Sequence, residues 1–281
     1  MWTAGIVPPG RERDRIILDV TGPLARLPRS LFWLGGAYLV VVAVVATGLH
    51  RSLDRSVAAV LWQDVPCWGR VVSERVSILF AAELSLLYAV AMGFVCLRSR
   101  RLWAAGWIVF VLFAGIGVEI TFKYYFVQPA PSAFLETLRR MPCAQAGLAY
   151  PLTSVATPST LPSGYSIRAA YFCLLLAAMI GARWPRLRWP AWLGLGALAL
   201  VTAASRVTVG WHWPTDVVAG VLLGACAAVL VLSQADGFRW LGARGGTRPR
   251  SGSASRSRAR VGAASGGRGS ASRPSARQSR R

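Results

Sequence analysis

Residues 102–126 read LWAAGWIVFVLFAGIGVEITFKYYF, and this stretch decides the fold class. A helix needs about 20 mostly apolar residues to cross the hydrocarbon core of a membrane, and this run supplies them. Five further segments meet the same requirement: 31–49, 77–97, 166–182, 188–204 and 214–233. The sequence therefore predicts an all-α polytopic membrane protein, built as a bundle of six transmembrane helices.

The composition agrees with this prediction. The chain has 281 residues, of which 54% are hydrophobic, and yet its formal net charge is +21. That combination conflicts with one soluble domain and fits a membrane protein with basic segments on the cytoplasmic side. The first apolar run begins only near Leu31, after a mixed-charge segment, so it is expected to be a spanning helix and not a cleavable signal. We expect a cytoplasmic N-terminal segment at 1–30, a membrane domain at 31–233 and a tail at 237–281.

The charges of the connections predict the topology. Residues 98–101 join the second and third spans, residues 183–188 lie between the fourth and fifth, and both contain arginines and no acid. By the positive-inside rule, both connections are cytoplasmic. An even number of spans then places both termini in the cytoplasm, in a multi-pass protein of the cell membrane. The segments at about 50–76, 127–165 and 205–213 are expected to face outward.

The C-terminal segment has a separate character. Arginine, serine and glycine dominate residues 237–281, and no acidic residue occurs there. Such a composition cannot bury a core and predicts disorder. Anionic lipid headgroups are the expected partner of this basic tail. Nucleic-acid binding is disfavoured, because no aromatic residue follows Trp240.

Cysteines and histidines are few. The chain has five cysteines without a C-x-x-C pair and only two histidines, so the sequence predicts no metal site, and we expect no cofactor. Cys67 and Cys143 both fall in segments expected to face outward. A disulfide between them and two free thiols are both open.

The chemistry-bearing stretch is SRVTVGWHWPTD, residues 205–216. Pro214 suits the first turn of a helix, which places His212 at the mouth of the sixth span and Asp216 about one turn further in. A carboxylate at that spacing can hold one imidazole nitrogen and leave the other directed at a substrate. The pattern indicates a histidine nucleophile. Arg206, just across the short loop, offers a planar fork for phosphate oxygens.

These residues, together with Pro162-Ser163-Gly164, resemble the type 2 phosphatidic acid phosphatase (PAP2) superfamily, in its membrane-bound branch. The third family motif, Ser-Arg, five residues, His, three residues, Asp, is complete at 205–216. The second, Pro-Ser-Gly-His, is met at three of four positions, with Tyr165 in place of the histidine. In the first, Lys followed by six residues and Arg-Pro, Lys123 matches and Ala130 replaces the arginine. The resemblance covers roughly residues 31–233.

The resemblance implies metal-independent hydrolysis of a phosphate monoester or pyrophosphate on a lipid, at the outer face of the membrane. His212 would attack phosphorus and form a phosphohistidine, supported by Asp216, and water would then release the phosphate. The groups that would hold the phosphoryl oxygens are Lys123, Arg206, Ser163 and the backbone N–H of Gly164. The general acid of the family corresponds to Tyr165.

Two departures from the motifs affect this prediction. Arg168 lies three residues after Tyr165, on the same face of the expected helix, and can replace the arginine lost at Ala130. Tyrosine has an unperturbed pKa near ~10, so it can donate a hydrogen bond or proton but is a poor base for the second step. A slower enzyme, or one restricted to good leaving groups, is expected. His50 is the other histidine that can supply an acid.

Glu119 precedes Lys123 by four residues, the favourable order for a helical ion pair, and we expect it to position that lysine. Two alternatives to a lipid phosphatase stay open: a catalytically impaired protein that binds lipid phosphates, and a phosphotransferase to an alcohol acceptor. Retention of both His212 and Asp216 favours catalysis over mere binding. A soluble haloperoxidase of the vanadate type is disfavoured by the six spans.

Overall fold

The computed structural model describes residues 27–126, 128, 131 and 158–242, and within these ranges all regular elements are helices. They follow one another as α1 (Arg29–Thr47), α2 (Arg51–Asp64), α3 (Cys67–Ile78), α4 (Ala82–Arg98), α5 (Leu102–Tyr125), α7 (Gly164–Arg183), η4 (Pro185–Leu187), α8 (Arg188–Thr208), α9 (Pro214–Gln234) and η5 (Asp236–Leu241). The all-α class predicted from the sequence is confirmed.

Five of these segments are long and apolar enough to cross a membrane: α1, α5, α7, α9 and the stretch Pro185–Thr208 that includes α8. The remaining predicted span, 77–97, is not one straight helix. It falls on α3 and α4, which are bent by 45° at a short break and qualify as a span only together. The break follows a turn in which the N–H of Phe80 donates to the carbonyl of Ser77 at 3.0 Å, and it lies at Ala81, whose backbone is extended (φ −60°, ψ 158°). Residues 50–76, expected as a loop, contain α2 and most of α3.

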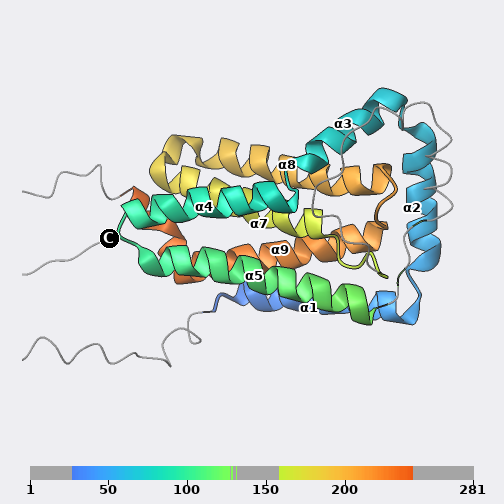
Figure 1. Ribbon diagram of the computed structural model, residues 1–281, viewed down its shortest axis with the longest axis horizontal. Helices are drawn as coiled ribbons and strands as arrows, with labels where there is room; N and C mark the ends of the chain where they lie inside the picture. Colours follow the sequence, from blue (N-terminus) through green and yellow to red (C-terminus); the bar gives the residue numbers. More distant parts are fainter. Residues whose placement is uncertain (1–26, 127, 129–130, 132–157, 243–281) are drawn as a thin grey trace, which may run out of the picture. The chain divides into compact units, whose positions relative to one another are not determined.

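The helices of the bundle run side by side, and α2 crosses one of its ends (Figure 1). Three chain segments meet at that end: the end of α5, the start of α7 and the turn from α8 into α9. The arginine-rich turns at 98–101 and 183–188 lie at the opposite end. The fold therefore gathers all three motif regions at one end of the bundle, away from its basic turns.

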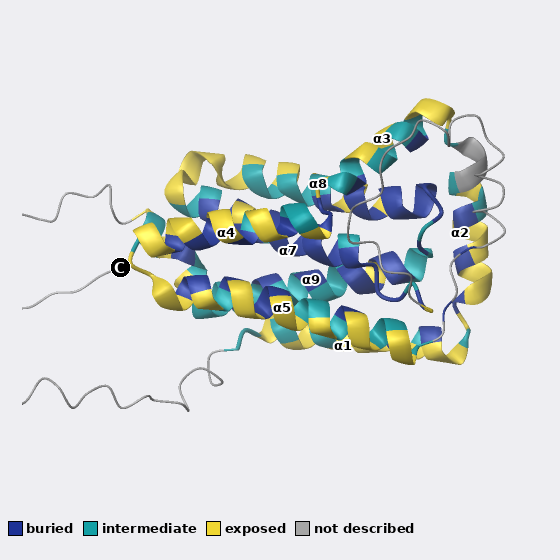
Figure 2. Ribbon diagram, viewed as in Figure 1, coloured by how far each residue is buried: buried dark blue, intermediate teal, exposed yellow. Residues whose placement is uncertain are grey.

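Burial separates a central helix from peripheral ones (Figure 2). α7 lies in the middle, packs mainly on α8 and α9, and buries most of its length. The outer helices expose large apolar side chains, among them Phe32, Trp33, Leu39, Leu86, Leu87, Phe94, Phe110, Phe113, Leu193 and Leu200. Exposed apolar bands around a core with buried polar groups are what a lipid environment requires.

Two glycines on α9 allow the closest helix contact in the site region. A methyl group on Gly220 would lie 2.5 Å from the carbonyl oxygen of Ser163, and one on Gly224 would strike the carbonyl of Ile167. Small residues spaced four apart let helix backbones approach closely inside membranes. The start of α9 is thereby placed directly against the start of α7.

The boundaries of the expected segments differ slightly from the structure. η5 buries Phe238 completely against the core cluster, so the packed helical part reaches Leu241, past the boundary predicted at residue 237. Residues 1–26 and 243–281 lie outside the described ranges, and the tail stays a prediction. Cys67 is disulfide-bonded. Cys143, the partner that the sequence leaves open, lies outside the described residues, so that pairing stays open.

Candidate active site

The loop between α8 and α9 carries the third motif, and its backbone closes on the end of α8. Gly210 has a φ of 76°, a left-handed conformation that glycine adopts without steric penalty and that commonly ends helices. The backbone N–H groups of Trp211 and His212 then both donate to the carbonyl of Arg206, at 3.1 and 3.3 Å. This turn explains the five-residue spacing between arginine and histidine, because the loop folds the histidine back over the arginine.

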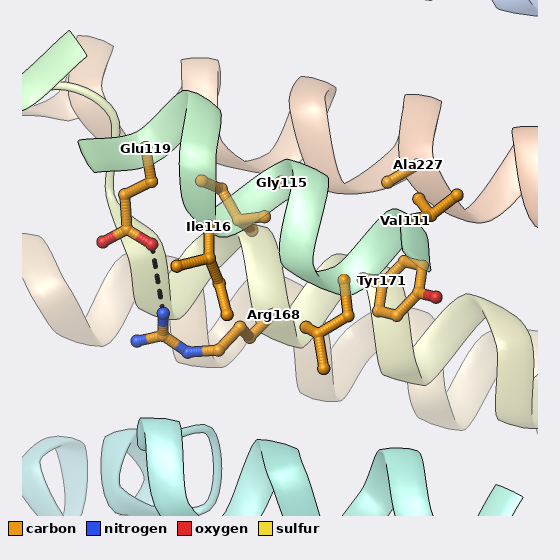
Figure 3. A pocket seen from close by; sticks show the side chains of 9 residues that line it. Val111, Gly115, Ile116, Glu119, Arg168, Tyr171 and Ala227 are labelled. Carbon is orange, nitrogen blue, oxygen red and sulfur yellow. Dashed lines mark hydrogen bonds and ion pairs between the residues drawn. The ribbon is translucent and has the colours of Figure 1, made fainter. Parts of the chain in front are cut away.

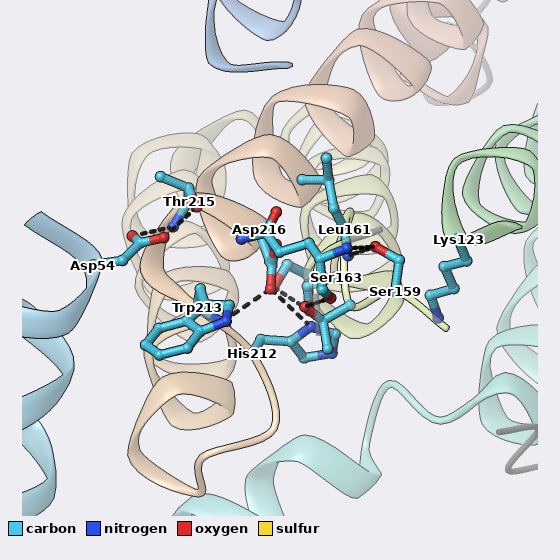
Figure 4. A network of polar contacts seen from close by, with 12 residues as sticks. Asp54, Lys123, Ser159, Leu161, Ser163, His212, Trp213, Thr215 and Asp216 are labelled. Carbon is cyan, nitrogen blue, oxygen red and sulfur yellow. Dashed lines mark hydrogen bonds and ion pairs between the residues drawn. The ribbon is translucent and has the colours of Figure 1, made fainter. Parts of the chain in front are cut away.

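His212 and Asp216 form the pair that the sequence predicts. The Nδ1 atom of His212 lies 3.7 Å from Oδ2 of Asp216, and the same oxygen accepts a hydrogen bond of 2.9 Å from the N–H of Trp213 (Figure 4). Asp216 is completely buried. With Nδ1 directed at the carboxylate, Nε2 is the ring nitrogen that can attack a substrate.

The protonation state of His212 suits that role. Burial lowers the pKa of its imidazole; the carboxylate of Asp216 opposes this shift, and the nearby cations Arg206 and Lys123 add to it. A lowered pKa keeps the ring neutral at pH values where a free histidine would be protonated. The neutral ring is the nucleophilic form, so the surroundings favour attack on an electrophile.

The second motif lies directly against the third. The backbone N–H of Ser163 donates to the carbonyl of Asp216 at 3.0 Å, a contact that the glycines of α9 permit. Ser163 is the N-cap residue of α7 and is fully buried, and its Oγ accepts a hydrogen bond of 3.1 Å from Ser166. That bond leaves the hydrogen of the Ser163 hydroxyl available for an acceptor such as a phosphate oxygen. The hydrogen bond from Ser166 to Ser163 was not predicted from the sequence.

The first-motif lysine belongs to a buried charge cluster between α5 and α7. Glu119 accepts from Nζ of Lys123 at 2.7 Å and from Nη1 of Arg168 at 3.1 Å. The Nε of Arg168 donates to the carbonyl of Phe80 at 2.9 Å. Figure 3 shows Glu119 and Arg168 joined at one end of a small pocket that is otherwise lined mainly by apolar side chains. The structure thus brings Arg168 and Lys123 to one anionic group.

Tyr165 lies between two guanidinium groups. The Cζ atom of Arg206 is 4.0 Å from the centre of its ring, and that of Arg168 is 5.1 Å from it. Both distances are within the range of cation–π attraction. Tyr165, which replaces the histidine of the second motif, therefore contacts both Arg206 of the third motif and Arg168, the arginine expected to replace the one missing at Ala130.

Asp54 is a site-region residue that sequence reasoning missed. Its carboxylate accepts from the backbone N–H of Thr215 at 3.0 Å and from the Thr215 hydroxyl at 2.6 Å, which caps the first turn of α9 near His212 (Figure 4). Burial raises the pKa of Asp54, and the bonds from Thr215 oppose that shift. The signal available in the sequence was weak, because Asp54 lies in a segment expected to be a loop.

His50 makes polar contacts around the start of α2, one of them with Gln128, inside the first-motif stretch. Its Nε2 lies 4.0 Å from Asp54 and 3.4 Å from Nε2 of Gln128, and its Nδ1 is 3.3 Å from the carbonyl of Val44. These contacts tie the start of α2 to its neighbours. Ala130, the position of the missing motif arginine, lies outside the described residues.

The comparisons with known proteins agree with this geometry. The sequence model of the PAP2 superfamily matches residues 102–240, a range that runs from α5 into η5 and includes all three motif regions. The resemblance to that superfamily, first indicated by the motifs, is confirmed.

A solved structure gives a more particular likeness. It is the crystal structure of the first transmembrane PAP2 type phosphatidylglycerolphosphate phosphatase from Bacillus subtilis, and it matches 73% of this chain and 94% of its own with a TM-score of 0.57. The sequence identity is 22%, so the likeness shows the fold. No curated protein matches the sequence. The chain is therefore a multi-pass membrane protein with a PAP2-type fold.

Proposed function

We propose that the chain is a membrane lipid phosphatase that hydrolyses a phosphate monoester or pyrophosphate on a lipid through a phosphohistidine intermediate. One observation carries the proposal. His212 is buried with Nδ1 facing the carboxylate of Asp216. Next to it lie the cations and helix-terminal N–H groups proposed to hold a phosphate, here called the cradle: Lys123, Arg168, Arg206, Ser163 and the N–H of Gly164. Mere binding of a phosphate needs neither a nucleophile nor the carboxylate that orients it.

In the first step, Nε2 of His212 attacks phosphorus. The N–P bond forms while the bond from phosphorus to the leaving oxygen breaks, and Asp216 stabilises the positive charge that develops on the ring. In the transition state the negative charge of the transferring group is spread over its three equatorial oxygens, so fixed cations and donors placed around these oxygens lower the barrier. The residues that supply them are Lys123, Arg168, Arg206, Ser163 and the N–H of Gly164. Because these groups already provide positive charge, the reaction is proposed to proceed without a metal ion.

Tyr165 is the proposed donor to the leaving oxygen. Its hydroxyl gives up a proton to the leaving oxygen, and the guanidinium groups of Arg168 and Arg206 contact its ring and help to hold it in place. Water then attacks the phosphohistidine and gives its proton to the phenolate of Tyr165, the N–P bond breaks and inorganic phosphate leaves. A phenol gives up its proton to the leaving oxygen less readily than an imidazolium, so turnover is proposed to be slower than with a histidine at this position. A pyrophosphate is affected less, because its leaving group needs less protonation.

The extracytoplasmic face is the proposed place of the reaction. The motif residues gather at the end of the bundle opposite the arginine-rich turns at 98–101 and 183–188. Cytoplasmic connections are the ones enriched in Lys and Arg. Both termini are then cytoplasmic, and the basic tail is proposed to lie near anionic headgroups of the inner leaflet.

The substrate class is a lipid with a terminal phosphate. The solved structure similar to this chain is titled a phosphatidylglycerolphosphate phosphatase, which makes that lipid one candidate substrate. Phosphatidate and a prenyl pyrophosphate carrier offer the same terminal group to His212.

A release assay tests the proposal. Purified wild type, His212→Ala and Tyr165→His are incubated with a panel of the three lipid phosphates, with and without EDTA, and inorganic phosphate is measured. We expect release by wild type that EDTA does not reduce, none by His212→Ala and faster release by Tyr165→His. Equal background release by wild type and His212→Ala would refute the enzyme assignment. Phosphohistidine that accumulates without release would identify the second step as the block.

A further inference from the structure

The carboxylate of Glu119 is held by two cations, as the oxygens of a bound anionic ligand would be. Its Oε1 lies 2.7 Å from the ammonium of Lys123 and its Oε2 lies 3.1 Å from the guanidinium of Arg168, so each oxygen has its own cation. Glu119 itself is only 8% exposed. The two cations come from different helices, α5 and α7, and they meet at this carboxylate.

The same carboxylate also lies against the first residue of α7. A methyl group added to Gly164 would collide with both carboxylate oxygens of Glu119. The first turn of a helix presents unpaired N–H groups and a partial positive charge, which attract anions. α7 is a 20-residue helix, and Gly164 directly follows its N-cap residue Ser163. Glu119 therefore occupies space where the start of α7 favours a negative charge.

Two of the groups proposed to hold the substrate phosphate, the Lys123 ammonium and the Arg168 guanidinium, are thus bound to Glu119, and its carboxylate packs against Gly164. We propose that Glu119 sets the affinity of this cradle for anions, because its carboxylate is an internal anion that competes with the substrate phosphoryl group. The inference rests on the proposed function, because it assumes that the cradle binds phosphate. It differs from a purely positioning role, in which Glu119 would help Lys123 to bind phosphate.

An internal competitor gives the site a threshold. Displacing the carboxylate subtracts the same free energy from the binding of every anion. Headgroups that are phosphodiesters carry one negative charge, and they gain less from two cations than a phosphate monoester, which carries nearly two at neutral pH. Because the penalty is the same for every anion, the ratio of the two affinities is unchanged. The penalty instead sets how tightly an anion must bind to occupy the cradle, and a singly charged diester falls below that level before a monoester or pyrophosphate does.

Binding of small phosphates to the purified full chain tests the proposal without any turnover. The probes are inorganic phosphate and dimethyl phosphate, a soluble diester, and the dissociation constants come from the rise in melting temperature with probe concentration. Glu119→Gln keeps the shape of the side chain and removes its charge. We expect Glu119→Gln to lower the dissociation constant of both probes by the same factor, about tenfold, which corresponds to about 1.4 kcal/mol.

Two variants serve as controls. Glu74→Gln removes one carboxylate from α3, outside the cradle, and should leave both constants within about twofold of wild type, the ordinary scatter of such constants. Glu119→Asp keeps the charge and should keep the weak binding. Phosphate binding that is weaker or unchanged in Glu119→Gln, a change confined to one probe, or no binding to any variant would overturn the proposal.

The outcomes also separate this proposal from the proposed function. Tighter binding in Glu119→Gln by a chain that releases no phosphate from lipids would support the competitor and refute the enzyme. Turnover that depends on His212, together with weaker binding in Glu119→Gln, would support the enzyme and give Glu119 the positioning role.

Discussion

Replacing Asp54 with alanine removes two hydrogen bonds from the first turn of α9. The carboxylate accepts from the Thr215 N–H at 3.0 Å and from its hydroxyl at 2.6 Å, and Asp54 is only 2% exposed, so water does not readily replace it. A hydrogen bond to a charged group contributes about 1.5–3 kcal/mol, and loss of a helix cap alone costs about 1 kcal/mol. We expect Asp54→Ala to lower the free energy of unfolding by about 3 kcal/mol.

The assay is thermal unfolding of the purified protein in detergent. For a chain of this size, about 3 kcal/mol corresponds to a fall in Tm of roughly 6–12 °C. Asp54→Asn is the matched control. Its side-chain oxygen still accepts from the Thr215 N–H, and its amide can donate to the Thr215 hydroxyl, which also accepts. Because burial raises the pKa of Asp54, the neutral amide also avoids burying a charge.

Asp54→Asn should therefore lose no more than about 1 kcal/mol, the worth of one ordinary hydrogen bond. A double-mutant cycle with Thr215→Val tests whether the two side chains act through each other, and we expect a coupling of about 1 kcal/mol. Equal losses of Tm in Asp54→Ala and Asp54→Asn would refute the capping argument, because they would point to the charge and not to the two hydrogen bonds.

Three other predictions concern the site. Tyr165→Phe keeps the ring that both guanidinium groups contact, so it should bind inorganic phosphate within about twofold of wild type. Tyr165→Leu loses the ring and should bind phosphate about five- to tenfold more weakly. Equal weakening in the two variants would contradict the idea that the ring holds the two arginines in place. Gly224→Leu should destabilise the protein by roughly 1–3 kcal/mol, measured as a fall in Tm, while Gly196→Leu on α8, which meets nothing within 4 Å, should not. The pKa of the His212 imidazole, one of only two in the chain, should lie below ~6.5 when measured by nitrogen NMR. The fall of kcat/KM at acid pH should have its midpoint below the same value. A midpoint above it would contradict the effect of burial.

The number of spans and the position of the motifs were within reach of the sequence. Apolar run length predicts spanning helices because the bilayer requires it, and the run at 102–126 became α5 almost residue for residue. The pairing of His212 with Asp216 follows from helical spacing once Pro214 marks the start of a helix, and the structure has that geometry. The assignment of roles to the individual site residues stays a prediction.

Other features depended on contacts between distant segments, which spacing along the chain cannot report. Asp54 and Thr215 are 161 positions apart, and the helix that carries Asp54 was expected to be a loop because its apolar content is too low for a span. The second cation on Glu119 was missed for the same reason. The spacing to Lys123 is local, but Arg168 reaches Glu119 from another helix, 49 positions away.

The contact between α7 and α9 has a consequence for protein engineering. The backbone bond from Ser163 to Asp216 and the glycines that permit it make the two helices one inseparable module. A chimera that imports α7 from a homologous protein would keep its serine at the same distance from Asp216 only if α9 came from the same donor. α5 contacts this pair through the Glu119 carboxylate and also accepts a hydrogen bond from the Tyr171 hydroxyl at the carbonyl of Ile108, 2.7 Å away. Grafting experiments should therefore move α7 and α9 together and keep the α5 side chains that pack on them.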